Sequence, residues 1–239
     1  MFKLNKILLA TTAALLTTTA VNVNAASVDI RHEYKHDTES NGNRIKIGGS
    51  TKSDLGTHYY SVEMKFNGRT GTYGFDDLER GDSEVVYEFK HYVTDKFYVQ
   101  PGMPITMGEE RVTYKPQLRI GYDFDSGITT KLRYRHEFRD FTSSKENGDT
   151  WQKSKVTANL DYTWNNMIQF GFEANYEKAH EGDNWLLYDG KTWNYDYNLK
   201  IGYKNESNWR PYVEFGNVSE SSKTDDRQLR SRVGLTYSF

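Results

Sequence analysis

The sequence predicts an all-β fold, a transmembrane antiparallel β-barrel of about 12 strands with short periplasmic turns and longer external loops. Three observations predict it. The chain begins with an export signal, its remaining length divides into segments of about ten residues in which apolar and polar residues alternate, and the connections between these segments alternate between short and long. Together these features are typical of barrels that cross an outer membrane.

Residues 1–25 are predicted to be a signal peptide. Two lysines precede an apolar run over residues 7–21, which is too short to span a bilayer comfortably. Val23 and Ala25 are small or medium-sized residues at the two positions that signal peptidase recognises. We therefore expect cleavage after Ala25 and a barrel over residues 26–239. Because no later window holds about 18 consecutive apolar residues, the sequence excludes a helical membrane protein.

The composition excludes several classes of function. With 31 basic and 33 acidic residues the net charge is −2, which does not suit a protein that coats nucleic acid. The absence of cysteine excludes disulfides, thiolate chemistry and cysteine-ligated zinc. The mean hydropathy of −0.83 is still compatible with a barrel, because only every second residue of its wall must be apolar. Aromatic residues, at 15%, are the residues of membrane-interface girdles.

Twelve alternating segments can be counted along the chain, and five of their connections are short. An even count places both termini at the short-turn end, where the last strand can pair with the first and leave no open edge in lipid. The chain ends on Phe239, which resembles the terminal aromatic signal read by the barrel-assembly machinery. The segments cover residues 27–37, 43–52, 57–67, 82–92, 96–105, 111–124, 128–140, 152–164, 167–180, 193–204, 209–220 and 228–239.

The apolar phase of each segment is expected to face lipid, and the opposite phase to face the lumen. In the segment over residues 111–124, Leu118 and Ile120 belong to the lipid phase, and Arg119 belongs to the lumen phase. Inward acids separate two groups of inward basic residues. The seam track, where the barrel closes, comprises Arg31, Arg44, Lys46, Arg230 and Arg232, and the far track, on the sixth and seventh segments, comprises Lys115, Arg119, Arg133, Arg135 and Arg139.

Two interpretations of these inward charges are open. In the first, acids and bases pair with one another and fill the lumen, as in small barrels. In the second, twelve strands enclose a narrow wet channel in which arginines select anions, because the guanidinium fork matches a carboxylate. The sequence favours the second interpretation, a passive porin in the outer membrane of a Gram-negative bacterium, with no cofactor and no metal.

Two other kinds of outer-membrane barrel were weighed. An enzyme would need an acid, a histidine and a serine, or paired carboxylates, at the external rim, and no convincing set forms around His58 or His180. The second alternative is a structural or adhesive barrel with a plugged lumen, whose loops bind a partner. It is retained because Trp151, Trp185 and Trp193 lie in or beside the longer loops. These tryptophans are nevertheless the residues expected for an external aromatic girdle.

The chain resembles the oligogalacturonate-specific, KdgM-like family of outer-membrane porins, which includes a sialic-acid-inducible channel. The resemblance spans the mature chain and is carried by residues 28–34, residues 113–116 with Arg119, residues 132–138, and the closing strand to Phe239. An Arg-His-Glu-aromatic motif recurs in the first and third of these stretches.

This resemblance implies a monomeric twelve-stranded barrel whose two facing basic tracks conduct acidic mono- or oligosaccharides. Outer-membrane lipid, lipopolysaccharide and, through Phe239, the barrel-assembly machinery are the other expected partners, and no nucleic acid is expected. The sequence does not choose among uronate oligomers, sialic acids and alginate fragments, because all of them present carboxylates to guanidinium groups.

Overall fold

The computed structural model describes residues 25–68, 78–142, 150–182, 185–204 and 206–239. The predicted signal peptide lies outside these residues except for Ala25, where the first strand begins. Every regular element in the described part of the chain is a β-strand. No helix in that part is long and apolar enough to span a membrane.

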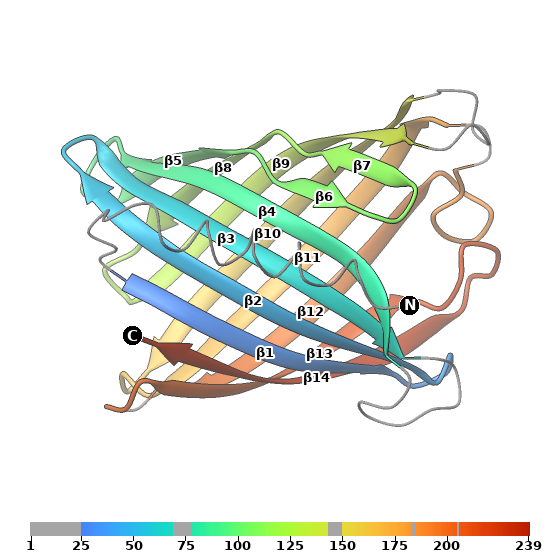
Figure 1. The fold of residues 1–239 in the computed structure, drawn as a ribbon. Coiled ribbons are helices and arrows are strands. Elements are labelled where there is room, and N and C mark those ends of the chain that lie inside the picture. The colour runs from blue at the N-terminus through green and yellow to red at the C-terminus, as the bar shows by residue number, and fades with distance from the viewer. Residues whose placement is uncertain (1–24, 69–77, 143–149, 183–184, 205) are drawn as a thin grey trace, which may run out of the picture.

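The strands form one antiparallel sheet that closes on itself, because β14 pairs with β1 through nine residue pairs from Ser27 with Ser238 to Lys35 with Arg230 (Figure 1). The strands are β1 Ala25–Lys35, β2 Ser40–Ser53, β3 Gly56–Gly68, β4 Leu78–Tyr92, β5 Phe97–Gly102, β6 Ile105–Met107, β7 Arg111–Tyr114, β8 Gln117–Asp123, β9 Ile128–Phe141, β10 Thr150–Trp164, β11 Ile168–Glu181, β12 Trp193–Tyr203, β13 Trp209–Ser219 and β14 Arg227–Ser238.

These fourteen strands occupy twelve positions around the barrel. β5 and β6 both pair with β4, and β7 and β8 both pair with β9, in unchanged register. The interruptions contain Pro104 and Pro116, which have no N–H to donate to the ladder. The two breaks are neighbours, since the Lys115 amide donates to the Pro104 carbonyl at 2.9 Å. The prediction of about twelve strands is therefore confirmed, and its fifth and sixth positions are each split in two.

The connections differ at the two ends of the barrel, as predicted. Turns over residues 54–55, 93–96 and 165–167 lie at one end, and the longer connections lie at the other (Figure 1). Asn165 and Asn166 have φ angles of 48° and 57°, as a tight type I′ hairpin turn requires. The carboxyl terminus lies at the short-turn end, which is periplasmic in outer-membrane barrels, and a hydrogen bond from the last residue to Ala26 fixes it there.

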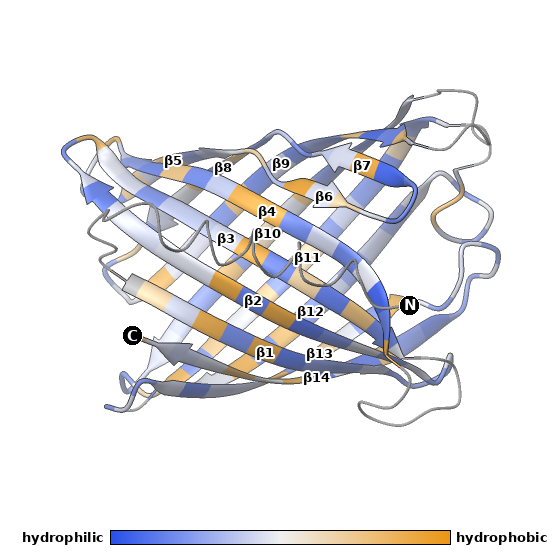
Figure 2. Cartoon of the chain, in the orientation of Figure 1, coloured by the Kyte–Doolittle hydropathy of each residue, from blue (hydrophilic) through white to orange (hydrophobic). Residues whose placement is uncertain are grey.

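Hydrophobic and hydrophilic residues alternate along the strands (Figure 2). Ile30, Leu118 and Leu132 are exposed on the outside, whereas Thr157 and Gln228 are almost completely buried inside. In a soluble protein the apolar side chains are inside and the polar ones outside. Here the order is reversed, as expected for a barrel whose outer face contacts lipid.

Two tyrosine rings lie flat against the inner wall, where a neighbouring strand has glycine. A Cβ atom built on Gly121 would lie 2.2 Å from a ring carbon of Tyr98, and one on Gly234 would lie 2.1 Å from a ring carbon of Tyr212. Since no real side chain tolerates such contacts, the glycines make room for the rings. Both tyrosines are almost completely buried as a result.

Substitution of Gly234 by alanine tests this packing. We expect Gly234→Ala to lower the free energy of unfolding by about 1–3 kcal/mol, because the Tyr212 ring must move off the wall. Gly202→Ala is the matched control on β12, since its new Cβ would meet nothing closer than 3.7 Å. Denaturant unfolding of the refolded barrels, followed by tryptophan fluorescence, measures both, and equal losses in the two variants would contradict the assignment.

Candidate functional site

All ten basic residues of the two predicted tracks lie on the inner face. On β9, Arg133 and Arg135 alternate with Leu132 and Tyr134, whose side chains are exposed on the outside. Hydrophobic and hydrophilic residues alternate on the other strands too (Figure 2), and the apolar neighbours of these basic residues, such as Ile30, Leu118 and Leu229, are exposed. The remaining residues are Arg31 on β1, Arg44 and Lys46 on β2, Lys115 between β7 and β8, Arg119 on β8, Arg139 on β9, and Arg230 and Arg232 on β14.

The seam track contains a row of three cations on adjacent strands. Lys65 on β3 is in register with Arg44 on β2, which is in register with Arg31 on β1. Like charges directly opposite one another destabilise a sheet. Two acids offset part of this repulsion. Asp29 is hydrogen-bonded to Arg44, and Glu63 lies 3.3 Å from Arg44 and from Lys65.

Carboxylates also hold the arginines of β14 against the wall. The Arg232 Nε atom donates to Glu33 at 2.6 Å, and the same guanidinium group contacts Glu214. Arg230 lies 3.9 Å from Glu33 and 4.0 Å from Glu214. These shared acids fix the directions of the two side chains.

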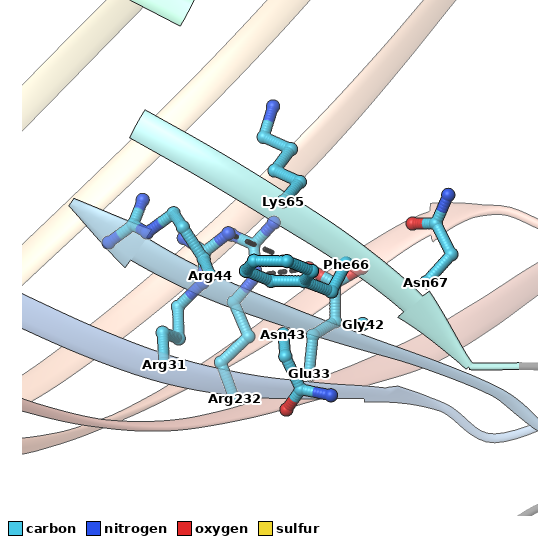
Figure 3. A pocket seen from close by; sticks show the side chains of 9 residues that line it. All are labelled: Arg31, Glu33, Gly42, Asn43, Arg44, Lys65, Phe66, Asn67 and Arg232. Carbon is cyan, nitrogen blue, oxygen red and sulfur yellow. Dashed lines mark hydrogen bonds and ion pairs between the residues drawn. The ribbon is translucent and has the colours of Figure 1, made fainter. Parts of the chain in front are cut away.

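A hollow of about 170 Å³ opens on the seam track. Figure 3 shows the side chains of Arg31 on β1, Arg44 on β2 and Arg232 on β14 gathered around it. The hollow is large enough for several water molecules or for part of one sugar ring. Its charged lining residues are Arg31, Glu33, Arg44, Lys65 and Arg232.

The far track also places cations side by side. Arg119 is in register with Arg133, and Arg135 is in register with Lys155 on β10. Arg133 donates to the Thr157 hydroxyl at 3.0 Å, and no ion pair links it to an acid in the described part of the chain. Like charges directly opposite one another destabilise a sheet, so these pairs are unfavourable by themselves.

Other members of the far track are paired with acids on β4. The Lys115 Nζ atom lies 2.9 Å from Glu84, and an Arg119 Nη atom lies 3.7 Å from Glu88. These acids are partly buried, as the tracks are. The far track therefore mixes neutralised and unneutralised cations.

The two tracks face each other across the barrel. The seam track is centred on β1 and the far track on β9, which are six of the twelve positions apart in either direction. Acidic side chains on the strands between them separate the two tracks. These acids are Glu63, Glu84, Glu88, Glu173, Glu177, Asp196 and Glu214.

Many arginines of the tracks keep an unused donor. In the described structure six buried Nε atoms have no hydrogen-bond partner. Buried donors in proteins are almost always satisfied, so these atoms indicate positions where water or an anion is bound. The six belong to Arg31, Arg44, Arg119, Arg133, Arg139 and Arg230.

Two inward cations on β10 were missed by the sequence analysis. Lys153 lies 2.9 Å from Glu177 and 3.5 Å from Glu137, and Lys155 extends the far track by one strand. The signal was present, because both lysines share the inward phase of Asp161 on the same strand.

Trp185 corrects the expectation of an external aromatic girdle. Its side chain is buried, and its ring lies 4.5 Å from the Arg139 guanidinium and 5.4 Å from the Lys153 ammonium, both on the inner face. The ring also packs against Trp151 at 5.2 Å. The connection between β11 and β12 thus carries an aromatic side chain onto the far track, although the spacing of tryptophans in the sequence gave no indication of this.

Neither histidine considered for catalysis has the partners of a triad in the described residues. His58 lies 3.1 Å from the Ser53 hydroxyl and His180 lies 2.8 Å from the Ser154 hydroxyl, but no carboxylate contacts either ring. Neither serine belongs to a catalytic set that the sequence predicts. The described residues also contain no cluster of three potential metal ligands.

Comparison with known proteins gives the same architecture. Residues 19–239 match the family described as "Oligogalacturonate-specific porin protein (KdgM)". The oligogalacturonate-specific porin KdgM of Dickeya dadantii is 33% identical over 233 residues, which is 95% of this chain and 98% of that protein.

Two solved structures show the same barrel. The NanC porin superposes with a TM-score of 0.72 at 16% identity and covers 88% of this chain and 98% of its own. The KdgM porin in complex with disordered oligogalacturonate superposes with a TM-score of 0.65 at 27% identity and covers 89% and 99%. The chain is therefore an outer-membrane β-barrel that belongs to the oligogalacturonate-specific porin family.

Proposed function

We propose that this porin conducts acidic mono- or oligosaccharides passively between its two basic tracks, without covalent chemistry. The observation that carries the proposal is the pair of facing arginine rows, in which six Nε donors have no partner among the described residues. Unused guanidinium donors on opposite walls suit a solute that carries a carboxylate on each sugar unit.

The relatives support this solute class. The Dickeya dadantii porin is named for oligogalacturonate, and a related porin was crystallised with it. An oligogalacturonate carries one carboxylate per sugar, so it can contact several basic residues at once. We propose this class first, and sialic acids and other uronates as competing solutes.

The acids beside the tracks help to keep binding weak. Glu33 and Glu214 take up part of the charge of Arg230 and Arg232, so a carboxylate in transit competes with fixed carboxylates for the same donors. Passage requires binding that is strong enough to admit a solute and weak enough to release it. A series of partly neutralised sites meets both requirements.

The first prediction concerns the wild-type channel. In a planar bilayer at low salt, the refolded mature protein should be anion-selective, and trigalacturonate should block its current reversibly, because the sugar occupies the tracks. Maltotriose, a neutral trisaccharide, is the control and should block far less. A folded barrel that conducts no current would show that the interior charges pair and close the lumen.

The second prediction concerns the far track. Two unit charges 4 Å apart interact by about 1 kcal/mol in water, so Arg133→Ser with Arg135→Ser should lower the anion-to-cation permeability ratio roughly fivefold or more. The fold should persist, because lumen positions affect selectivity more than stability. The reversal potential under a salt gradient measures the ratio.

The matched control replaces both arginines by lysine. It keeps the charge and should keep the anion selectivity in simple salt, but it removes the planar fork and should weaken block by trigalacturonate. Equal selectivity in the wild type and the serine variant would remove these two residues from the pathway.

We further propose that the porin is a monomer, surrounded by outer-membrane lipid and lipopolysaccharide, and that Phe239 is read by the barrel-assembly machinery. Phe239 is 74% exposed, and its ring packs edge-to-face with Tyr237 at 4.9 Å between ring centres. Such a side chain is accessible to a partner at the barrel seam.

Phe239→Ala tests the role of the terminal ring. The variant should reach the outer membrane in lower amounts in cells, yet refold in detergent as completely as the wild type, because the ring makes few contacts in the barrel. Heat-dependent mobility in gels measures both fractions. Unchanged membrane levels would exclude the terminal ring as an assembly signal.

A further inference from the structure

Two lysines outside the predicted tracks stand over tyrosine rings on the inner wall. The Lys90 Nζ atom lies 3.8 Å from the centre of the Tyr98 ring, and the Lys200 Nζ atom lies 3.7 Å from the centre of the Tyr212 ring. These distances are well within the range of a cation–π interaction. The rings are the two that Gly121 and Gly234 allow to lie flat.

The two arrangements have the same construction. Tyr98 pairs with Tyr92 on β4, and Tyr212 pairs with Gly202 on β12. In both cases the lysine precedes the paired residue by two positions. Each tyrosine is in turn in register with its glycine on the next strand. The same three-strand unit therefore occurs twice in one barrel.

The local sequences around the two units agree as well. The residues that lead to the lysines are Tyr-Glu-Phe-Lys over 87–90 and Tyr-Asn-Leu-Lys over 197–200. The tyrosines begin Tyr-Val-Gln-Pro-Gly over 98–102 and Tyr-Val-Glu-Phe-Gly over 212–216. Recurrence in both sequence and register indicates that the unit has a role beyond filling space.

The two units lie opposite each other at the periplasmic mouth. Lys90 is on β4 and Lys200 is on β12, which are six positions apart, and both are within three residues of the short-turn end of their strands. A solute that leaves the tracks toward the periplasm passes between them.

Neither ammonium group forms an ion pair among the described residues, and the acid linked to Lys90 is Asp123, which accepts a hydrogen bond from the Tyr92 hydroxyl. In the described part of the chain, no carboxylate lies within 4 Å of Lys90 or Lys200, whereas Lys115 and Lys153 are ion-paired. Lys90 donates one hydrogen bond, to the Tyr92 hydroxyl at 2.8 Å. Each ammonium group has three donors, so donors remain free to meet a carboxylate in the lumen.

The rings explain why these lysines stay in place. A lysine side chain is long and flexible, and near a pore mouth it would extend into bulk water. The electron-rich ring face instead holds the charge beside the wall, and it accepts no proton and forms no ion pair that a solute carboxylate would have to displace. Tyr98 and Tyr212 are positioning residues in this arrangement.

We propose that Lys90 and Lys200 form two opposed exit sites, which bind the carboxylates of the acidic saccharide as it leaves the tracks at the periplasmic mouth. This inference rests on the proposed function. It assigns solute-binding roles to two lysines, and positioning roles to two tyrosines, that the basic tracks do not include.

The test measures block by trigalacturonate added separately to each side of single channels in a bilayer. Because the chain has no cysteine, Lys223→Cys in an exposed long loop and a membrane-impermeant thiol label identify which side is external. Lys90→Met with Lys200→Met should weaken block from the short-turn side by about fivefold. This factor corresponds to the loss of a charge–charge interaction of about 1 kcal/mol. Block from the long-loop side should change less.

Two further variants separate position from charge. Tyr98→Leu removes the ring and should weaken block from the short-turn side, whereas Tyr98→Phe keeps the ring and should preserve it. Lys178→Met, which removes an exposed lysine from the outer face of β11, is the control for loss of a charge and should leave block unchanged. Gel mobility before and after heating confirms that every variant is folded.

The outcomes distinguish this inference from the proposed function. If trigalacturonate does not block the wild type from either side, the proposed function is wrong. If it blocks the wild type, and the double lysine variant is blocked equally from the short-turn side, the tracks conduct the sugar and the exit sites do not exist. A loss that is equal from both sides would also overturn the exit sites.

Discussion

Closure of the sheet is the constraint on which the rest of this structure depends. In lipid no water is available to bond an open strand edge, so β14 must pair with β1, and the chain must turn back at every membrane surface. The prolines show how strict the requirement is. Pro104 and Pro116 interrupt the ladders, but they do so beside each other, and the Lys115 amide bonds the Pro104 carbonyl within the break.

Closure and the period of two together decide where charge can lie. Once the outer face is given to side chains such as Leu118 and Leu132, every strand has only its inner face for charged residues. Acids and bases are therefore brought close together inside the barrel, where unpaired charges are costly. The structure relieves this by placing carboxylates on the strands between the two basic walls and by sharing acids such as Glu33 between arginines.

The same period made the fold and most of the candidate pathway predictable from the sequence. The segment predicted over 128–140 is Ile128–Phe141, and the inward residues of that strand follow from its phase. The fourth strand begins at Leu78 rather than at 82, because its first residues pair across a bulge at Met64 and Phe66 and do not alternate. Contacts that depend on loops or on neighbouring strands, such as Trp185 on Arg139 and Lys90 on Tyr98, leave no periodic signal.

The distribution of neutralised and free cations gives the interior a direction. Near the seam the arginines share acids. On the far wall Arg133 lies opposite Arg119 and donates a hydrogen bond to the Thr157 hydroxyl. At the periplasmic mouth, Lys90 and Lys200 rest on tyrosine rings and form no ion pair among the described residues. In the proposed pathway, a carboxylate that moves inward would meet first partly occupied guanidinium groups and then compact ammonium groups, which water solvates more strongly and which release an anion more easily. Such a sequence of sites favours transit over retention, because most guanidinium groups of the tracks already contact an acid and the ammonium groups at the exit have no bidentate fork.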